Sequence, residues 1–480
     1  MSIHPVRVLV AAMCLSGARL AVAAGPSWIC TTADAPWVAR PAPPVVVGPA
    51  ADADLVVHLR APLQRVDGFG GCFNELGWGA LLALPQADRT RVLRDLFADD
   101  GCGFTLARMP IGASDYARDW YSLDDTPGDL ALAHFSIDRD RACLVKYVAA
   151  AMAVRPELGL WLSAWSPPAW MKDNGRYHSG HLKGDPAVHA AYAAYLARAV
   201  QAYQGQGLHV YAAMVQNEPR SDNVYPTCLW TGQQEHDFIR DHLGPTFRDR
   251  HVDAELWLGT LNDGNVDDYA GPVLSDPAVA PFVAGVAYQW EGRDAIAETH
   301  RRFPRLKLMQ SESECGGGAN SFADAEHTFG LLRTYFNGGA GSYFYWNMVL
   351  RPDGKSSWGW RQNALVSVDP DAKRVAYHPE FYLMKHASHF VRPGSHLATT
   401  TGRWVDKLAF IRPDGSAVVL VGNSSDGPLP VVVGLADDGT GSADRSARAV
   451  LPGHSFSTFV IPGVAAAATR PAVDVVTPAH

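Results

Sequence analysis

The chain has 480 residues, which exceeds one average domain and suits an α/β barrel with a small companion domain. Hydrophobic residues make up 47% of it, enough for a sizeable core. The formal net charge is −8 without any Lys/Arg-rich run, so the charge pattern gives no support for nucleic-acid binding.

The N-terminus has the pattern of an export signal. Arg7 supplies a positive charge, Val8–Ala18 is apolar over a signal-like length, and Ala21-Val22-Ala23 is a small-x-small cleavage site. We therefore expect residues 1–23 to be removed near Ala23 and the mature protein to be periplasmic or secreted. An uncleaved apolar N-terminus is the alternative. No later stretch is long and apolar enough to span a membrane, so stable membrane insertion is not expected.

Six cysteines follow this segment, and an exported protein could pair them. Sequence does not give their connectivity, and their spacing fits no zinc template. We expect those beside the site segments to be buried free thiols. The six are Cys30, Cys72, Cys102, Cys143, Cys228 and Cys315.

Residues 24–65 contribute to a β-domain in our interpretation. Pro36–Pro49 has the composition of a linker or an edge strand, and Leu55–Leu59 alternates like a strand. From Val66 onward, short apolar runs alternate with helical stretches such as Arg141–Arg155 and Val188–Tyr203. Eight strands that alternate with helices predict a (β/α)₈ TIM barrel over residues 66–385. The predicted strands are Val66–Gly71, Phe104–Pro110, Gly159–Ala164, His209–Val215, Glu255–Thr260, Val283–Tyr288, Leu306–Gln310 and Gly341–Trp346.

The pattern changes again after the predicted barrel. Short strands at Leu408–Ile411, Ser416–Val421, Val431–Leu435 and Ser457–Ile461 predict an antiparallel β-sandwich domain over residues 386–464. The strand near Leu55 would join it, so this domain would be formed from both chain ends. Residues 465–480 lack periodicity and are expected to be a disordered tail.

Two carboxylates follow apolar runs that read as buried strands. Glu218 lies in Gln216-Asn217-Glu218-Pro219, after Val210–Val215, and Glu312 follows Leu306–Met309. Active sites of barrels lie at the carboxyl ends of the strands. A retaining glycosidase needs an acid/base and a nucleophile with carboxyls about 5 Å apart. The alternative for Glu218 is that it caps the next helix.

The second carboxylate has a neighbour of the same type. Glu314 lies two residues beyond Glu312 and would face the same way in extended chain. Glu312 is closer to the end of the strand, and we favour it as the nucleophile, with Glu314 as the alternative.

Other strand ends carry polar and aromatic residues. Gly68-Phe69-Gly70-Gly71 lacks the G-K-[ST] of a phosphate loop, so we interpret it as a tight bend that lets Glu75 reach the pocket. Arg108 either orients the nucleophile or forms a structural pair. Asn217 can donate a hydrogen bond to a sugar hydroxyl or to the nucleophile. The remaining candidates for substrate contact are Trp165, Gln289, Trp290 and Trp346.

A metal site is not expected. His178, His181 and His189 lie close together in sequence, but no carboxylate completes a known ligand spacing, so we interpret them as surface histidines.

At these residues the chain resembles glycoside hydrolase family 30, which includes the glucosylceramidases. The resemblance runs from about Val66 to Ile461. It is carried by Gly68-Phe-Gly-Gly, Arg108-Met-Pro-Ile, Ser163-Ala-Trp-Ser-Pro-Pro-Ala-Trp, Gln216-Asn-Glu-Pro, Ser311-Glu-Ser-Glu-Cys and Tyr345-Trp-Asn.

The resemblance implies a barrel with a β-sandwich side domain and hydrolysis of β-glycosides with retention, without a cofactor. It implies that Glu218 is the acid/base and Glu312 the nucleophile, and that Trp165, Asn217 and Trp346 lie in the pocket. Glu75 falls where glucosylceramidases have an Asp that binds glucose hydroxyls. The nucleophile segment is one residue longer than the S-E-A-C of the lysosomal member, which keeps Glu314 open.

The predicted function is therefore that of a retaining, exo-acting β-glucosidase of the glucosylceramidase type, with a carbohydrate or glycolipid substrate. A β-1,6-glucanase or another β-glycanase of the same family is the alternative. A non-catalytic carbohydrate-binding protein is the alternative from another class, and the presence of both glutamates argues against it.

Overall fold

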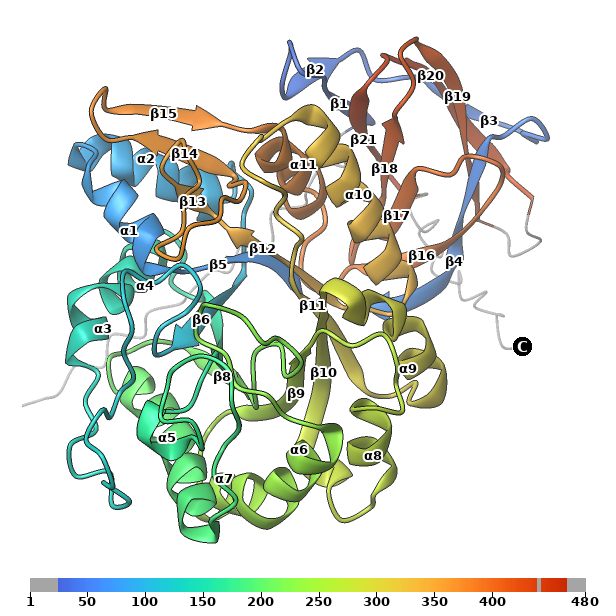
Figure 1. The fold of residues 1–480 in the computed structure, drawn as a ribbon. Helices are drawn as coiled ribbons and strands as arrows, with labels where there is room; N and C mark the ends of the chain where they lie inside the picture. Colours follow the sequence, from blue (N-terminus) through green and yellow to red (C-terminus); the bar gives the residue numbers. More distant parts are fainter. Residues whose placement is uncertain (1–24, 438–441, 464–480) are drawn as a thin grey trace, which may run out of the picture.

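Eight parallel strands close into a barrel in the computed structural model, which describes residues 25–437 and 442–463 (Figure 1). The predicted signal segment 1–23 and the predicted tail 465–480 lie outside the described residues. Every predicted barrel strand is present, with ends shifted by a few residues. In barrel order the strands are β10 (Val283–Gln289), β11 (Lys307–Glu312), β12 (Ser342–Asn347), β5 (Gly68–Cys72), β6 (Leu106–Ile111), β7 (Gly159–Ala164), β8 (Val210–Met214) and β9 (Glu255–Leu261).

The glycines near residue 70 are part of strand β5 and do not form the predicted bend. A Cβ atom on Gly70 would lie 2.0 Å from the carbonyl oxygen of Leu106, and one on Gly71 would lie 2.2 Å from Met348 Cγ. Glycine is required at both positions because β5 runs unusually close to its neighbours. Inside the barrel, Trp161 packs edge-on against Phe344 with ring centroids 5.3 Å apart.

Helices cover the outside of the barrel (Figure 1). The helix predicted over Arg141–Arg155 is divided, because Cys143 leaves helical geometry at φ −132° and ψ −83°. The helix predicted over Val188–Tyr203 is α5, which begins one residue after its capping residue Asp185. The helices are α1 (Glu75–Leu82), α2 (Gln86–Phe97), α3 (Asp138–Ala142), α4 (Leu144–Met152), α5 (Pro186–Gln204), α6 (Gly232–Phe238), α7 (Gly244–Asp249), α8 (Ala270–Ser275), α9 (Ile296–Arg302), α10 (Phe322–Asn337) and α11 (Pro379–Ser388).

A small three-stranded sheet follows β12 and was not predicted from the sequence. It consists of β13 (Val349–Leu350), β14 (Val366–Asp369) and β15 (Arg374–Tyr377), and β13 packs against α1. The segment between β13 and β14, residues 351–365, lies at the carboxyl ends of the barrel strands and supplies part of the candidate site described below.

Both ends of the chain build the second large sheet, as predicted. Strand β4 lies between β16 and β19, and its pairing with β19 is parallel, whereas the other pairs of this sheet are antiparallel. The predicted linker Pro36–Pro49 contains the two edge strands, β2 and β3. Strands β1, β16 and β20 were not predicted. In sheet order the strands are β2 (Val38–Arg40), β1 (Ser27–Thr31), β21 (Ser455–Ile461), β18 (Ala417–Asn423), β17 (Lys407–Ile411), β16 (His396–Thr401), β4 (Leu55–Arg65), β19 (Leu429–Ala436), β20 (Arg445–Leu451) and β3 (Val45–Val47).

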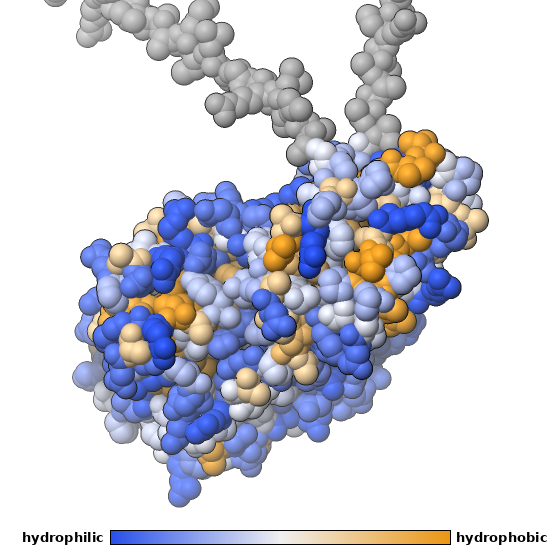
Figure 2. All heavy atoms as spheres, turned by 90° about the horizontal axis from the view of Figure 1, so that it is seen from above, coloured by the Kyte–Doolittle hydropathy of each residue, from blue (hydrophilic) through white to orange (hydrophobic). Residues whose placement is uncertain are grey.

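This sheet has its own apolar core, which includes Leu55, Val419 and Phe459. Helix α11 packs against β21 and runs across the predicted boundary between residues 385 and 386. Exposed apolar side chains, among them Val47 and Val450, lie on the edge strand β3 and on β20. Figure 2 shows apolar residues at the end of the molecule that carries the sheet domain and a second group at the opposite end.

Two further predictions concern membrane-spanning segments and the state of the cysteines. Among the helices of the described chain, none has the length and apolar character needed to cross a bilayer. Each of the six cysteines predicted to follow the signal segment is a buried free thiol.

A buried glutamate on α6 predicts a pH-dependent stability. Burial raises the pKa of Glu235 to about 8, and neither of its carboxyl oxygens has a hydrogen-bond partner. Because the folded-state pKa lies above the unfolded value near 4.5, the contribution of Glu235 to the free energy of unfolding is greatest below about pH 4.5. Its contribution is then lost as the pH rises through 8, by on the order of 5 kcal/mol. We therefore expect Glu235→Gln to raise the melting temperature more at pH 8.5 than at pH 5.

The readout for Glu235 is the difference between the two pH values, because an unpaired amide carries the same burial cost at both. Glu291, an exposed glutamate, gives the matched control Glu291→Gln. A melting-temperature change for Glu235→Gln that is the same at both pH values would contradict a protonated Glu235.

Candidate active site

Glu218 lies just beyond the carboxyl end of β8. Its backbone adopts φ +48°, which is uncommon for a residue with a side chain, and its amide donates to the Thr260 carbonyl at 2.9 Å. Glu218 is 6% exposed. Such strain at a buried carboxylate is held by the surrounding structure and is typical of functional positions.

Three donors reach the Glu218 carboxylate. Gln289 Nε2 donates to Oε1 at 3.1 Å, while Ser221 Oγ and Tyr225 OH donate to Oε2 at 3.0 and 2.7 Å. Ser221 follows Glu218 in a turn closed by the bond from the Ser221 amide to the Glu218 carbonyl at 2.9 Å. Glu218 is not the cap of the next helix, because α6 begins at Gly232 and is capped by Thr231.

Glu312 is the last residue of β11 and is buried in the same place. Arg108 Nη1 donates to its Oε2 at 2.7 Å, Gln289 Nε2 donates to the same oxygen at 3.2 Å, and Trp290 Nε1 donates to Oε1 at 3.2 Å. The predicted candidates Arg108, Gln289 and Trp290 thus all contact this carboxylate.

Gln289 fixes how far apart the two carboxylates can be. Its Nε2 atom contacts Glu218 at 3.1 Å and Glu312 at 3.2 Å. The two contacted oxygens therefore cannot lie farther apart than the sum of these distances, about 6.3 Å. Retaining glycosidases hold their carboxyls about 5–5.5 Å apart and inverting ones about 6.5–9.5 Å. The two carboxyls therefore lie within the reach of one amide nitrogen, as expected of the closer pair of a retaining enzyme.

The hydrogen-bond partners distinguish the two carboxyls. The guanidinium, amide and indole nitrogens around Glu312 can only donate, so they favour its ionised form. The hydroxyls of Ser221 and Tyr225 beside Glu218 can also accept, so they tolerate a proton there. The partners of Glu312 therefore suit an attacking carboxylate, and those of Glu218 suit a group that gives and takes a proton during the reaction.

The pair cannot ionise freely. Burial raises the pKa of Glu312 to about 7, Arg108 opposes that rise, and the charge of Glu218 adds to it. Two close carboxyls titrate as a unit, and the second ionisation occurs at a raised pH. The site therefore keeps one proton on the acidic side of neutral.

Asn217 is held by the same network. Its Oδ1 accepts from Arg108 Nη2 at 2.6 Å, from Thr260 Oγ1 at 2.9 Å and from Gln289 Nε2 at 3.3 Å. Three donors on one oxygen fix the amide's orientation, and its NH₂ group remains to donate to a ligand.

Arg108 lies at the centre of the aromatic part of the site. It is fully buried, its Nε donates to Ser163 Oγ at 3.0 Å, and its guanidinium carbon lies 4.9, 4.2 and 5.3 Å from the ring centroids of Trp161, Trp165 and Trp346. Trp165 and Trp346 also pack on each other at 5.3 Å. The three rings and the ion pair hold the cation rigidly beside Glu312.

Glu75 does not reach this pocket, which corrects the sequence prediction. It begins α1, where its Oε1 accepts from Arg118 at 3.0 Å and its Oε2 from Arg139 at 2.9 Å. Glu75 lines a neighbouring pocket together with Arg118 and Asp353. The error arose from reading Gly68–Gly71 as a bend, whereas strand β5 and α1 carry the chain past the site.

Asp115 lies in the pocket instead and was missed. Its Oδ2 accepts from Trp346 Nε1 at 3.2 Å, and its buried Oδ1 has no partner. Burial and repulsion from Glu312 and Glu218 raise the pKa of Asp115 well above its usual range. It follows strand β6 as Glu218 follows β8, and that position at a strand end was the signal available in the sequence.

Glu314 points away from the pair. It forms ion pairs with Arg293 and with His327, the latter at 3.1 Å. Glu312, by contrast, lines the pocket. In extended chain, Glu312 and Glu314 would face the same way, but strand β11 ends at Glu312, so the two side chains point in different directions.

The carboxylates open into a cavity of about 330 Å³ at the carboxyl ends of the barrel strands. Five of its lining residues were not predicted: Asp115, Asn223, Tyr225, Trp360 and Gln362. Two of them lie in the segment between β13 and β14. The lining residues are Asp115, Trp165, Glu218, Asn223, Tyr225, Trp290, Glu312, Trp360 and Gln362.

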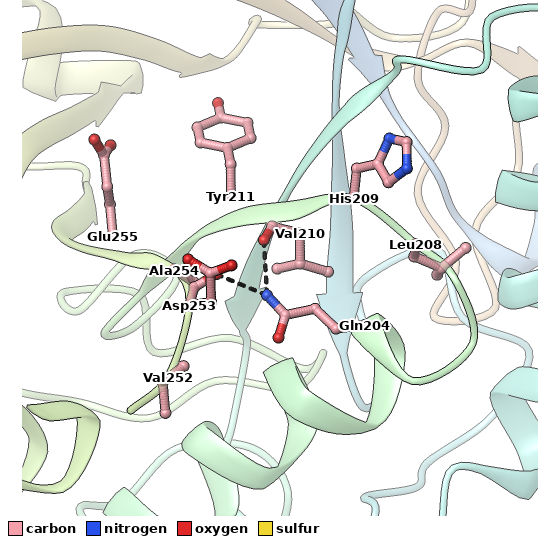
Figure 3. Close-up of a pocket in the computed structure, with 9 residues that line it drawn as sticks. All are labelled: Gln204, Leu208, His209, Val210, Tyr211, Val252, Asp253, Ala254 and Glu255. Atoms are coloured by element: carbon pink, nitrogen blue, oxygen red, sulfur yellow. Dashed lines mark hydrogen bonds between the residues drawn. The ribbon is translucent and has the colours of Figure 1, made fainter. Parts of the chain in front are cut away.

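A second hollow lies at the opposite end of the barrel, where β8 and β9 begin (Figure 3). Its polar side chains have structural roles. Gln204 Nε2 donates to the carbonyls of Val210 and Asp253 at 3.0 and 2.7 Å, and Glu255 accepts from Lys307 at 2.6 Å. These contacts hold the end of α5 and the starts of β8, β9 and β11 together.

Comparisons with known proteins identify the family. The family model for the glycosyl hydrolase family 30 TIM-barrel domain matches residues 66–391, and that for the family 30 beta sandwich domain matches residues 395–459. The chain belongs to glycosyl hydrolase family 30. It is therefore a glycoside hydrolase that acts on carbohydrate substrates.

Named relatives of this family 30 enzyme include two kinds of hydrolase. It is 30% identical to the lysosomal acid glucosylceramidase of Mus musculus over 85% of this chain and 83% of the relative. It is 28% identical to the endo-1,6-beta-D-glucanase of Neurospora crassa over 77% of this chain and 81% of the relative. The crystal structure of SrfJ from Salmonella typhimurium has the same fold, with a TM-score of 0.84 and 24% identity, over 91% of this chain and 99% of that one.

Proposed function

We propose that this family 30 enzyme is a retaining, exo-acting β-glucosidase of the glucosylceramidase type. The observation that carries the retaining mechanism is the contact of Gln289 Nε2 with both Glu218 and Glu312, which brings the two carboxyls within the reach of one amide nitrogen. The name of the mouse relative supports the glucoside substrate.

In the first step, the Glu312 carboxylate attacks the anomeric carbon and forms a glycosyl ester. Glu218 gives its proton to the glycosidic oxygen, so the leaving group departs as a neutral alcohol. Arg108 and Trp290 orient the attacking carboxylate. In the second step Glu218, now ionised, takes a proton from water, the water oxygen bonds to the anomeric carbon, and Glu312 is released.

The terminal glucose would be held by residues around this pair. Asp115 offers its carboxyl to a sugar hydroxyl, Trp165 and Trp360 line the pocket with aromatic surface, and the buried Trp346 holds Asp115 in place. Asn217 would donate to the 2-hydroxyl or to Glu312.

An endo-β-1,6-glucanase is the second candidate, favoured by the name of the fungal relative. A panel of aryl β-glucosides, glucosylceramide and β-1,6-glucan separates the candidates. Release of glucose alone supports the exo mode, whereas mixed oligosaccharides from β-1,6-glucan support the endo mode. The anomer formed first, followed by proton NMR, tests retention directly, and an inverted product would rule it out.

The pair predicts a bell-shaped pH profile. The rate should fall at low pH because the nucleophile becomes protonated, and fall again at higher pH because the pair loses the proton that general acid catalysis needs. We expect kcat/KM for an aryl β-glucoside to peak on the acidic side of neutral. A rate that is flat from about pH 4 to 9 at subsaturating substrate would contradict a mechanism based on paired carboxyls.

We also propose that the protein is exported, on the basis of the signal pattern in residues 1–23. Amino-terminal sequencing of the protein recovered outside the cytoplasm should begin near residue 24. A start at Met1 would count against cleavage.

A further inference from the structure

Aromatic rings form a track from the pocket to the surface. Tyr225 and Trp360 line the pocket, and their ring centroids are 5.2 Å apart. Trp360 lies 6.4 Å from Trp358, which meets Trp120 nearly edge-on at 5.1 Å. Trp120 is 37% exposed, so a large apolar side chain is presented to solvent at the outer end of the track.

The outer pair is held in place by its own loops. Trp120 follows β6 in the chain and Trp358 lies between β13 and β14, and the Ser357 hydroxyl joins these segments by donating to the Ala117 carbonyl at 2.6 Å. Tyr177 stacks on Trp120 with centroids 5.8 Å apart. Rings fixed in this way lose little freedom when a ligand binds.

The inner end of the track lies beside the proposed proton donor. Tyr225, the ring next to Trp360, donates its hydroxyl to Glu218 at 2.7 Å. Since the proton donor acts on the glycosidic oxygen, this is the side on which the leaving group departs. A long leaving group would extend along the rings.

Charged side chains lie beside the rings in the chain. Arg118 and Asp119 precede Trp120 in the chain and have exposed side chains, and the exposed Lys355 pairs through its backbone with Arg361 on either side of Trp358. A pyranose has an apolar face for an aromatic ring and hydroxyls for charged neighbours.

Alkyl chains would need a continuous apolar surface. The exposed Val46, Val47, Leu429 and Val450 lie on the sheet domain (Figure 2). At the rim, Val224 is 58% exposed between two pocket residues, but it is a single side chain, whereas the aromatic track offers several rings in a row. The rim therefore suits a sugar better than an alkyl chain.

We propose that Trp120 and Trp358 form a platform at the rim that binds further sugar rings of a β-linked glucose oligosaccharide on its leaving-group side. This inference rests on the proposed cleavage of β-glucosides and adds oligosaccharides of glucose to the β-glucosides that the site accepts.

The test compares three substrates: an aryl β-glucoside, the β-1,6-linked tetrasaccharide of glucose, and octyl β-glucoside. For Trp120→Ala and Trp358→Ala, we expect kcat/KM for the tetrasaccharide, divided by that for the aryl glucoside, to fall about tenfold. Trp120→Phe should recover most of the loss because it keeps a ring. Val405→Ala, at a 73% exposed position far from the pocket, is the control and should leave the ratio unchanged.

Two outcomes would overturn the platform. One is an equal loss on all three substrates, which indicates that the rings only support the loops. The other is a loss confined to octyl β-glucoside, which indicates an alkyl leaving group. Thermal melting identifies any variant that fails to fold, and Trp120→Phe then carries the comparison.

Failure of the proposed function is distinguishable from failure of the platform. If the unmodified enzyme cleaves no β-glucoside, the proposed function is wrong. In that case tetrasaccharide binding to the enzyme, measured by calorimetry with and without Trp120→Ala, decides the platform. Unchanged affinity would reject it, and about tenfold weaker affinity would support it.

Discussion

Glu312→Gln should lower kcat on every β-glucoside by at least about 10⁴-fold, because an amide oxygen cannot attack the anomeric carbon as a carboxylate does. Glutamine keeps the size of the side chain and can still accept from Trp290. Because Arg108 is fully buried and would lose its anionic partner, the variant should also melt at a lower temperature. Activity is therefore compared at a temperature where both proteins are folded.

Glu314→Gln is the matched control for this variant. Glu314 lies two residues farther along and pairs with Arg293 and His327 outside the pocket, so we expect its replacement to change kcat less than threefold. A fluorinated glucoside with a good leaving group should label unmodified enzyme on Glu312, as read by peptide mapping. A label on Glu314 would overturn the assignment, and no label with an inverted product would reject retention itself.

Glu218→Gln should have an effect that depends on the leaving group. General acid catalysis contributes about 10²–10⁴-fold, and it matters most when the departing oxygen is strongly basic. We expect a loss in that range for an alkyl or sugar leaving group and a much smaller one for an activated phenol. The measurement is kcat/KM across aryl glucosides of graded phenol acidity.

The hydroxyl contacts of Glu218 provide a comparison for that series. Tyr225→Phe removes one hydroxyl that can accept from protonated Glu218 and leaves the carboxyl itself in place. It should show the same dependence on the leaving group with a smaller amplitude. Equal losses for Glu218→Gln on basic and acidic leaving groups would remove Glu218 from the role of proton donor.

The barrel and the two glutamates were accessible from sequence because local pattern encodes them. Buried parallel strands are continuous apolar runs, and polar residues at their ends stand out against that background. Strands β16 and β20 were missed because polar residues interrupt them, as in Arg445–Leu451, where Arg448 faces solvent. The parallel pairing of β4 with β19 has no local signal, since residues far apart in sequence set it.

The sequence could not show that Asp115, rather than the predicted Glu75, lies in the pocket. Both are acidic residues a few positions beyond a barrel strand, and nothing in their neighbourhood separates them. The path of the chain decides: α1 begins at Glu75 and turns it toward Arg118 and Arg139, whereas Asp115 lies on a loop that folds back to Trp346. Trp360 and Gln362 were missed for the same reason, because a loop far from the predicted strands brings them in.

The central place of β4 in the second sheet has a consequence for synthesis on the ribosome. Strands β1 to β4 are translated first, yet β1 and β4 pair with β21, β16 and β19, which are translated last. These early strands remain without those neighbours while the whole barrel is made. Their unpaired edges are open to other strands during that interval, and a chain that stops before residue 396 never closes them. Premature termination should therefore yield an aggregating product, even though the barrel itself has been translated.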